Sequence, residues 1–232
     1  MSLIRTTKIF PAKSPNPKHA FLLCGFGGSI WQLRRLVAVL NRDGYTVTAM
    51  DFPQMVLSTG DPELLPRLIS EVVRVTEARA EELKQPILLV GVSLGALISL
   101  NILRRSAHYH KAVLITGGDI VKVAQRLYGS QVWPQSYQAL AAQWKDINMY
   151  SNLSSLKGKQ AIMILPVRDK LIDPDDVRQE IAIQQAAGND LQLIERRTFG
   201  HVGTIIEEAI LLPHRTRRYI ADLDKKVRPQ SP

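Results

Sequence analysis

Short apolar and β-branched runs alternate along the chain with longer segments in which apolar residues have helical spacing. The run at 87–90, Ile-Leu-Leu-Val, has no polar position, which is typical of a strand buried on both faces of a sheet. Seven runs are expected to be strands, at residues 7–10, 20–24, 46–51, 87–90, 112–116, 161–166 and 191–195. Strands without a polar face indicate a mostly parallel sheet that helices cover on both sides.

Helix starts can be located between these runs. Asp61 is a good N-cap and Pro62 a good first helical residue, although Pro66 could delay the start of the helix. Apolar residues at helical spacing follow them. Asp173 and Pro174 give the same start to a later helix. A last helix is expected from about residue 202, and Pro213 should kink or divide it. Because strand and helix alternate from end to end, we predict a doubly wound α/β fold in one domain, residues 1–232.

One segment, residues 120–156, is too long for a simple crossover between strands. We expect it to form a small helical lid over the sheet edge. Five of the nine Trp and Tyr residues lie in it: Tyr128, Trp133, Tyr137, Trp144 and Tyr150. Aromatic side chains offer rigid apolar walls with polar tips, so the first four are candidates for substrate contacts. Ordinary packing of the lid on the sheet explains them equally well.

Composition narrows the class of protein. The chain has 232 residues, of which 45% are hydrophobic and 22% charged, values typical of a globular protein. Its one cysteine, Cys24, excludes an intrachain disulfide and favours a reducing compartment. The N-terminus lacks the apolar core of a signal peptide, so we expect a cytoplasmic protein. Residues 86–103 approach membrane-spanning length, but glycine and polar residues interrupt them.

The formal net charge of +9 raises the question of an anionic partner. Lys and Arg occur as scattered pairs, such as Arg34-Arg35 and Arg217-Arg218, and no nucleic-acid-binding motif accompanies them. We therefore expect a solvated basic surface and no nucleic-acid partner. Peripheral contact with an anionic membrane surface stays open, and so does the oligomeric state.

The strongest chemical motif is Gly91-Val92-Ser93-Leu94-Gly95. It follows the apolar run at 87–90 and opens a helical pattern, and G-x-S-x-G becomes informative at such a junction. The glycines permit a sharp turn that exposes the serine at the carboxyl end of its strand. The first helical N–H groups would lie beside it and could stabilise an oxyanion. Ser93 is therefore the candidate nucleophile.

A serine nucleophile needs a base, and position in the chain selects one. His19, His108 and His110 precede their predicted strands, at the opposite end of a parallel sheet, and His214 falls within the last helical segment. His201, in Gly200-His201-Val202-Gly203, follows the last predicted strand and is the candidate base.

An acid should orient that histidine, and two strand ends offer one. Asp169 follows the run at 161–166 and is the preferred candidate. Asp119, after the run at 112–116, is the rival, although it could instead cap a helix beginning at Ile120. Asp173 is expected to be a helix cap first.

The order Ser93, Asp169, His201 resembles the α/β-hydrolase superfamily, and the resemblance extends over nearly the whole chain. It implies an oxyanion hole formed by the backbone N–H groups of Phe26, in Cys24-Gly25-Phe26-Gly27-Gly28, and Leu94. Phosphate binding by this glycine-rich loop is the weaker interpretation, because Ile30 stands where a dinucleotide motif has its third glycine. Cys24 replaces the usual histidine of this loop, and a small buried residue is its simplest role.

These features predict a serine hydrolase that cleaves a carboxylic ester through an acyl-enzyme on Ser93. An apolar acyl or aryl ester is the expected substrate, and a monoacyl lipid is one such compound. A thioesterase, acyltransferase or C–C hydrolase could use the same three residues. A non-catalytic binding protein on the same fold is the alternative from another class. The sequence indicates no metal site and no cofactor.

Overall fold

The computed structural model describes residues 2–153, 156–197 and 200–226. A seven-stranded sheet with the order β1-β3-β2-β4-β5-β6-β7 forms its centre. Every strand pairs parallel to its neighbours except β1, which runs antiparallel to β3. The strands are β1 Thr6–Phe10, β2 Lys18–Leu23, β3 Tyr45–Asp51, β4 Ile87–Val92, β5 Tyr109–Ile115, β6 Gln160–Pro166 and β7 Asp190–Arg196.

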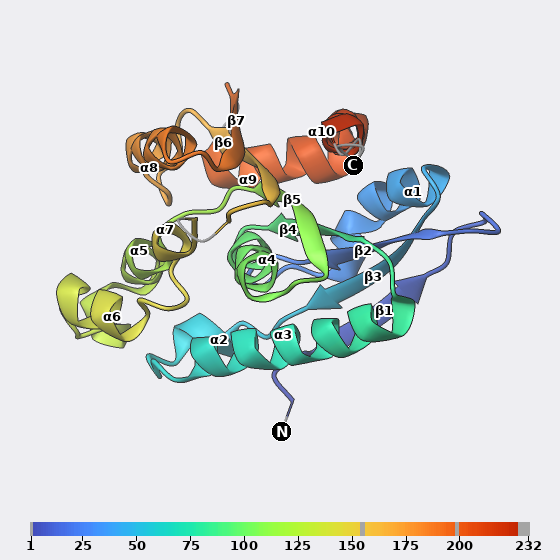
Figure 1. Cartoon of the computed structure of the whole chain (residues 1–232). Helices are drawn as coiled ribbons and strands as arrows, with labels where there is room; N and C mark the ends of the chain where they lie inside the picture. Colours follow the sequence, from blue (N-terminus) through green and yellow to red (C-terminus); the bar gives the residue numbers. More distant parts are fainter. Residues whose placement is uncertain (1, 154–155, 198–199, 227–232) are drawn as a thin grey trace.

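All seven predicted strands are present, and helices cover both faces of the sheet, which confirms the predicted α/β fold (Figure 1). Alternate residues of one strand enter different cores. In β4, Ile87 and Leu89 pack with α3 (Leu64–Leu83) and α4 (Leu94–Arg105), whereas Leu88 and Val90 pack with α1 (Arg34–Arg42) and α10 (Pro213–Lys226). Burial on both faces therefore explains why this strand has no polar position.

The helix boundaries follow the expected caps with one difference. The Asp173 side chain caps α8 (Pro174–Ala186), as predicted. The helix after Asp61 begins only at Leu64, and the Asp61 carboxylate accepts a hydrogen bond from the Glu63 N–H at 2.9 Å. Pro213 divides the last helical segment, because α9 (Gly200–Ile205) continues into the π-helical turn η2 (Ile206–Leu211) and α10 starts anew at the proline.

Three helices occupy the segment expected to be a lid: α5 (Ile120–Val132), α6 (Tyr137–Gln143) and α7 (Met149–Leu153). Residues 154–155 of the predicted range 120–156 lie outside the described residues. In Figure 1, α7 lies beside α4 and α8, α5 lies next to α7, and α6 lies farther out beside α5. Buried residues of this segment belong to the same hydrophobic core as those of α3 and α4. The remaining short helices are η1 (Ile30–Leu33) and α2 (Met55–Ser58).

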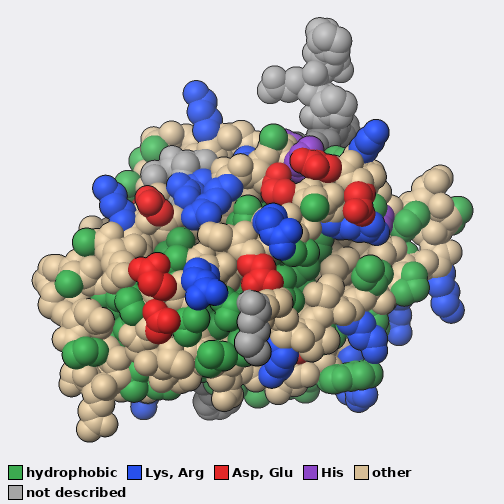
Figure 2. Space-filling view, turned by 90° about the horizontal axis from the view of Figure 1, so that it is seen from below, with side chains coloured by type: hydrophobic (Ala, Val, Ile, Leu, Met, Phe, Trp, Pro, Cys, Tyr) green, Lys and Arg blue, Asp and Glu red, His purple; other side chains and the backbone are tan. Residues whose placement is uncertain are grey.

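Positive and negative side chains are mixed on one face of the molecule. On the face seen from below, Lys and Arg side chains are interspersed with Asp and Glu side chains (Figure 2). This distribution agrees with a solvated surface on that face. Within the described part of the chain, no helix combines the length and the apolar character that crossing a membrane requires.

Candidate active site

Ser93 lies in the sharp turn between β4 and α4. Its backbone adopts φ +53° and ψ −115°, a conformation that L-residues rarely occupy, and its N–H donates to the Ile115 carbonyl at 2.8 Å. A Cβ on Gly95 would overlap the Leu23 carbonyl, and one on Gly91 would overlap the Gly95 carbonyl. Close approach of neighbouring backbone therefore requires both glycines of the G-x-S-x-G motif.

The structure brings Ser93, His201 and Asp169 together at the carboxyl edge of the sheet. His201 Nε2 lies 2.9 Å from Ser93 Oγ, and His201 Nδ1 lies 3.0 Å from Asp169 Oδ2. His201 is in the first turn of α9, and Asp169 follows β6. The hydroxyl, imidazole and carboxylate thus form one continuous hydrogen-bonded chain, the arrangement in which a serine can be activated as a nucleophile.

The Asp169 carboxylate is buried and fully engaged. Its Oδ1 accepts hydrogen bonds from the backbone N–H groups of Leu171 at 2.8 Å and Ile172 at 3.0 Å, which leaves Oδ2 for His201. Burial alone would raise the pKa of this carboxyl group, but the hydrogen bond and charge of His201 and the two backbone donors together lower its pKa below the ordinary value. Asp169 is therefore held ionised beside the imidazole.

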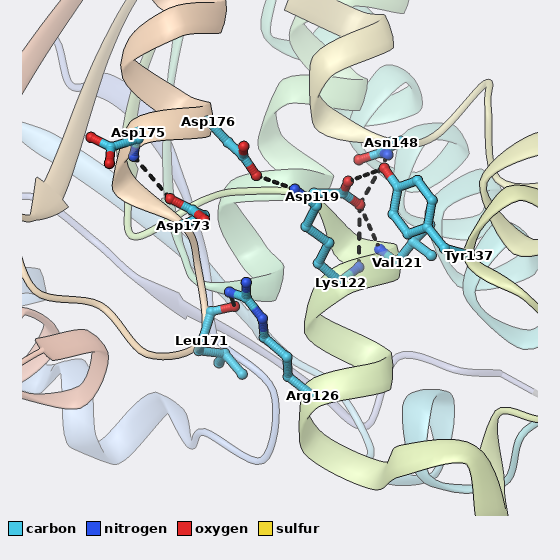
Figure 3. Close-up of polar contacts among 10 residues, drawn as sticks. All are labelled: Asp119, Val121, Lys122, Arg126, Tyr137, Asn148, Leu171, Asp173, Asp175 and Asp176. Atoms are coloured by element: carbon cyan, nitrogen blue, oxygen red, sulfur yellow. Dashed lines mark hydrogen bonds and ion pairs between the residues drawn. The ribbon is translucent and has the colours of Figure 1, made fainter.

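Asp119, the rival acid, has a different place in the structure (Figure 3). Its Oδ1 accepts hydrogen bonds from the N–H groups of Val121 at 2.9 Å and Lys122 at 3.3 Å, and from Asn148 Nδ2 at 3.1 Å. Its Oδ2 accepts from the Tyr137 hydroxyl at 2.6 Å. Asp119 therefore caps α5 and links it to α6 and to the residue before α7, and its oxygens are occupied away from the histidine.

The loop that contains Asp169 is attached to α5. Arg126 donates from Nη1 to the Leu171 carbonyl at 2.9 Å, and Lys122 forms an ion pair with Asp176 of α8 (Figure 3). Helix α5 is thus joined by polar contacts both to the loop that contains Asp169 and to α8.

The glycine-rich loop after β2 forms a tight turn beside Ser93. Gly28 N–H donates to the Gly25 carbonyl at 3.0 Å, and Gly27 has φ +66°, the positive φ that a type II turn needs at its third residue. Phe26, the second residue of the turn, lines the same cavity as Ser93. Leu94 opens α4, so its backbone N–H has no carbonyl acceptor within the helix. Phe26 and Leu94, the expected oxyanion donors, therefore both line the cavity that contains Ser93.

Ser93 and His201 line a cavity of about 460 Å³ at the carboxyl edge of the sheet. Among the described residues, no Asp, Glu, Lys or Arg side chain belongs to its wall. Most of the wall is aliphatic and comes from several elements, including Leu57, Leu97, Ile120, Val123, Ile172 and Ile206. The site can thus hold an uncharged apolar group beside the serine.

The four aromatic residues proposed as substrate contacts are not in this wall. Trp133 and Trp144 are buried and stack edge to face with ring centroids 5.1 Å apart. Their indole N–H groups donate to the carbonyls of Leu57 and Pro62 at 3.0 and 2.9 Å. Tyr128 packs edge to face on Phe26, and Tyr137 binds Asp119. Core packing, the alternative explanation, therefore accounts for the two tryptophans.

Sequence reasoning missed the wall residues on the His201 helix. Val202, Ile205, Ile206 and Ile210 all line the cavity. Their spacing is an apolar helical stripe that begins next to His201, and it could have been recognised as a cavity wall. Thr116, buried with φ +57°, also lines the cavity, and no sequence pattern marked it.

Cys24 also borders the cavity, but its thiol is fully buried. Burial, reinforced by the charge of Asp51, raises the pKa of the Cys24 thiol to about 12. The thiol is therefore held neutral, in agreement with its expected role as a small buried residue.

Comparisons with known proteins agree with this architecture. A model of the alpha/beta hydrolase family matches residues 20–224. An esterase of Pyrococcus furiosus superposes with a TM-score of 0.64 at 22% identity, over 90% of this chain and 82% of that one. The thermophilic esterase Est2 of Thermogutta terrifontis gives 0.68 at 16% identity, over 97% and 90%.

A third structure, Est1E of Butyrivibrio proteoclasticus, gives a TM-score of 0.70 at 11% identity over 93% of each chain. A search of curated proteins gives no significant match. At identities this low, the superpositions establish a shared fold.

Proposed function

The chain belongs to the alpha/beta hydrolase family, and we propose that within it the protein is a serine hydrolase that cleaves carboxylic esters through an acyl-enzyme on Ser93. The observation that carries the proposal is the hydrogen-bonded chain from Ser93 Oγ through His201 to Asp169, with distances of 2.9 and 3.0 Å. The Ser93 end of this hydrogen-bonded chain lies in the wall of an apolar cavity, where an ester carbonyl can approach the serine.

In the first half of the reaction, Ser93 Oγ attacks the ester carbonyl carbon and His201 Nε2 takes the hydroxyl proton. The carbonyl electron pair moves to oxygen, and the N–H groups of Phe26 and Leu94 stabilise the resulting oxyanion. As the carbonyl re-forms, the C–O bond to the alcohol breaks, and His201 gives its proton to the departing alkoxide. The products are a free alcohol and an acyl group esterified to Ser93.

Water completes the cycle by the same steps. His201 takes a proton from a water molecule as the water oxygen attacks the acyl carbon. The proton then passes to Ser93 Oγ as the bond to Ser93 breaks and the carboxylic acid product leaves. Asp169 holds the Nδ1 proton on the far side of the imidazole, which leaves Nε2 free to act as base, and its charge stabilises the imidazolium. The lowered pKa of the Asp169 carboxyl keeps that charge in place at neutral pH.

The cavity favours an uncharged, apolar acyl group. Its wall is largely aliphatic and, among the described residues, has no charged side chain to pair with an ionic substrate. Burying an unpaired charge there would be costly, whereas each buried methylene gains about 0.8 kcal/mol. An acyl chain of medium length, such as that of a monoacyl lipid, fits a volume of about 460 Å³.

Hydrolysis of a p-nitrophenyl ester series from acetate to palmitate tests the proposal. We expect kcat/KM to rise with chain length up to the size of the cavity, and Ser93→Ala to lose at least about 10³-fold in kcat. Ser70→Ala, which removes an exposed hydroxyl on α3, is the matched control and should keep full activity.

Parallel assays with acyl-CoA thioesters and with added alcohol acceptors compare hydrolysis with the related reactions of the same three residues. Turnover of thioesters alone, or acyl transfer in place of hydrolysis, would move the assignment to those classes. No turnover of any acyl compound by the folded protein would contradict it.

A further inference from the structure

The residue just before strand β1 brings a charged side chain to the Gly25–Gly28 turn, which contains the expected oxyanion donor Phe26. Because β1 runs antiparallel to β3, its start lies at the edge where the parallel strands end, with Thr6 opposite Asp51. Arg5, just before β1, donates its backbone N–H to the Asp51 carbonyl at 3.1 Å. The antiparallel edge strand is therefore what places this arginine near the active site.

Arg5 and Asp51 form a two-point ion pair. Arg5 Nε lies 3.1 Å from Asp51 Oδ1, and Nη2 lies 3.0 Å from Oδ2. The Asp51 side chain is only 6% exposed, whereas that of Arg5 is 44% exposed. Planar pairing of this kind fixes the orientation of the guanidinium group, which a lysine cannot reproduce.

The same guanidinium group holds the glycine-rich turn. Arg5 Nη2 also donates to the Gly28 carbonyl at 2.8 Å, and Asp51 Oδ2 accepts from the Ile30 N–H at 3.4 Å. Gly28 closes the turn through its bond to the Gly25 carbonyl. A buried carboxylate on β3 and an arginine before β1 thus fasten the far end of the turn that contains Phe26.

We propose that Arg5 and Asp51 are positioning residues that hold the Gly25–Gly28 turn so that the Phe26 N–H is aimed at the oxyanion. The inference rests on the proposed function, because the oxyanion exists only during acyl transfer. A donor for that charge acts on the transition state and little on substrate binding. Loosening the turn should therefore lower kcat and leave KM nearly unchanged.

Arg5→Lys and Asp51→Asn test the proposal. Removing an oxyanion donor outright costs on the order of 10²- to 10³-fold in kcat, so displacing one should cost about 10- to 100-fold. We expect that loss of kcat in both variants, with KM within about twofold of the wild-type value. Inhibition by an alkyl boronic acid, whose serine adduct mimics the tetrahedral intermediate, should weaken by the same factor as kcat. Thermal melting measures the folded fraction to which kcat is normalised.

Arg217→Lys is the matched control. Arg217 makes a similar two-point pair with Asp43, at 2.8 and 2.7 Å, on a part of the surface outside the cavity wall. This variant should keep kcat, KM and boronate affinity. Arg5→Ala supplies a second test, because the site is exposed enough for millimolar guanidinium to enter and restore part of kcat, whereas methylammonium should not.

The outcomes separate the two proposals. If wild type and Arg217→Lys hydrolyse esters while Arg5→Lys and Asp51→Asn keep kcat per folded molecule, or lose only kcat/KM through a raised KM, the positioning role is wrong and the proposed function stands. If the folded wild type turns over no acyl compound, the proposed function fails and this inference fails with it.

Discussion

At the carboxyl edge of the sheet, Ser93, Asp169 and His201 direct their polar atoms at one another, whereas the helical segment at 120–153 turns its tryptophans into the core. Both regions border the same cavity, since α5 contributes Ile120 and Val123 to its wall. The carboxyl edge of the sheet supplies the polar groups of the site, and the helical segment supplies part of the aliphatic wall.

The two regions differ in what fixes a side chain's direction. A residue that follows a parallel strand must leave the sheet at one edge, so its position in the chain nearly determines its neighbours. A residue on a packed helix turns toward whichever face gains most from burial, and a large aromatic side chain gains most in a core. Position therefore predicts chemistry at the strand ends, while residue type predicts packing in the helical segment.

The two candidate acids give the largest expected contrast between these regions. Asp169→Asn should lower kcat by about 10⁴-fold, because an amide at that position favours the wrong histidine tautomer. Asp119→Ala removes the carboxylate that caps α5 and accepts a hydrogen bond from Tyr137, so it should lower the free energy of unfolding by about 1–3 kcal/mol. Its kcat per folded molecule should fall by less than about tenfold. Steady-state kinetics and urea unfolding measure both quantities.

A loss of kcat per folded molecule in Asp119→Ala as large as that in Asp169→Asn would contradict the assignment of the acid. Equal unfolding midpoints for Asp119→Ala and wild type would contradict the capping role.

Truncating a buried tryptophan should separate stability from activity. Trp133→Ala removes a fully buried ring and its hydrogen bond to Leu57, so the free energy of unfolding should fall by about 3–5 kcal/mol. Trp31→Ala is the control, because that ring is 64% exposed and the loss should be below about 1 kcal/mol. Urea unfolding and steady-state kinetics at low temperature measure both effects. Unchanged stability of Trp133→Ala together with an altered acyl-chain preference would contradict the core-packing role.

Low pH should lower the stability of the folded chain through protonation of Asp169. The pKa of its carboxyl is lower in the folded chain than its ordinary value of about 3.9. The stabilising contribution is therefore complete above about pH 4 and is lost as pH falls through the folded pKa. Urea unfolding from pH 7 to pH 3 should show wild type losing more stability than Asp169→Asn, and parallel curves would contradict the coupling.

The smallest expected effect concerns Cys24, an edge residue with reactive chemistry that the site does not use. With a pKa of about 12 and a buried thiol, it should not react with a disulfide reagent at pH 8 in the folded protein. It should react fully once urea unfolds the chain. Rapid reaction of the folded form, followed by absorbance of the released thiolate, would mean that the loop beside Ser93 opens.

Much of this organisation could be predicted from sequence. Apolar runs located all seven strands of the described sheet, and the strand ends brought Ser93, Asp169 and His201 to one edge. The direction of the Trp133 and Trp144 side chains could not be predicted, since an aromatic residue on a short helix suits a core and a cavity equally. The position of Arg5 depends on an antiparallel edge strand, and nothing in the apolar run at 7–10 shows in which direction that strand pairs.

The central claim is that Ser93 is a nucleophile activated by His201 and Asp169. Reaction of the folded wild type with a fluorophosphonate, followed by peptide mass spectrometry, tests it most directly. We predict a single adduct on Ser93, formed rapidly in wild type, absent in Ser93→Ala and slowed by at least about 10³-fold in His201→Ala. No adduct on the folded wild type, or an adduct on a different residue, would contradict the account.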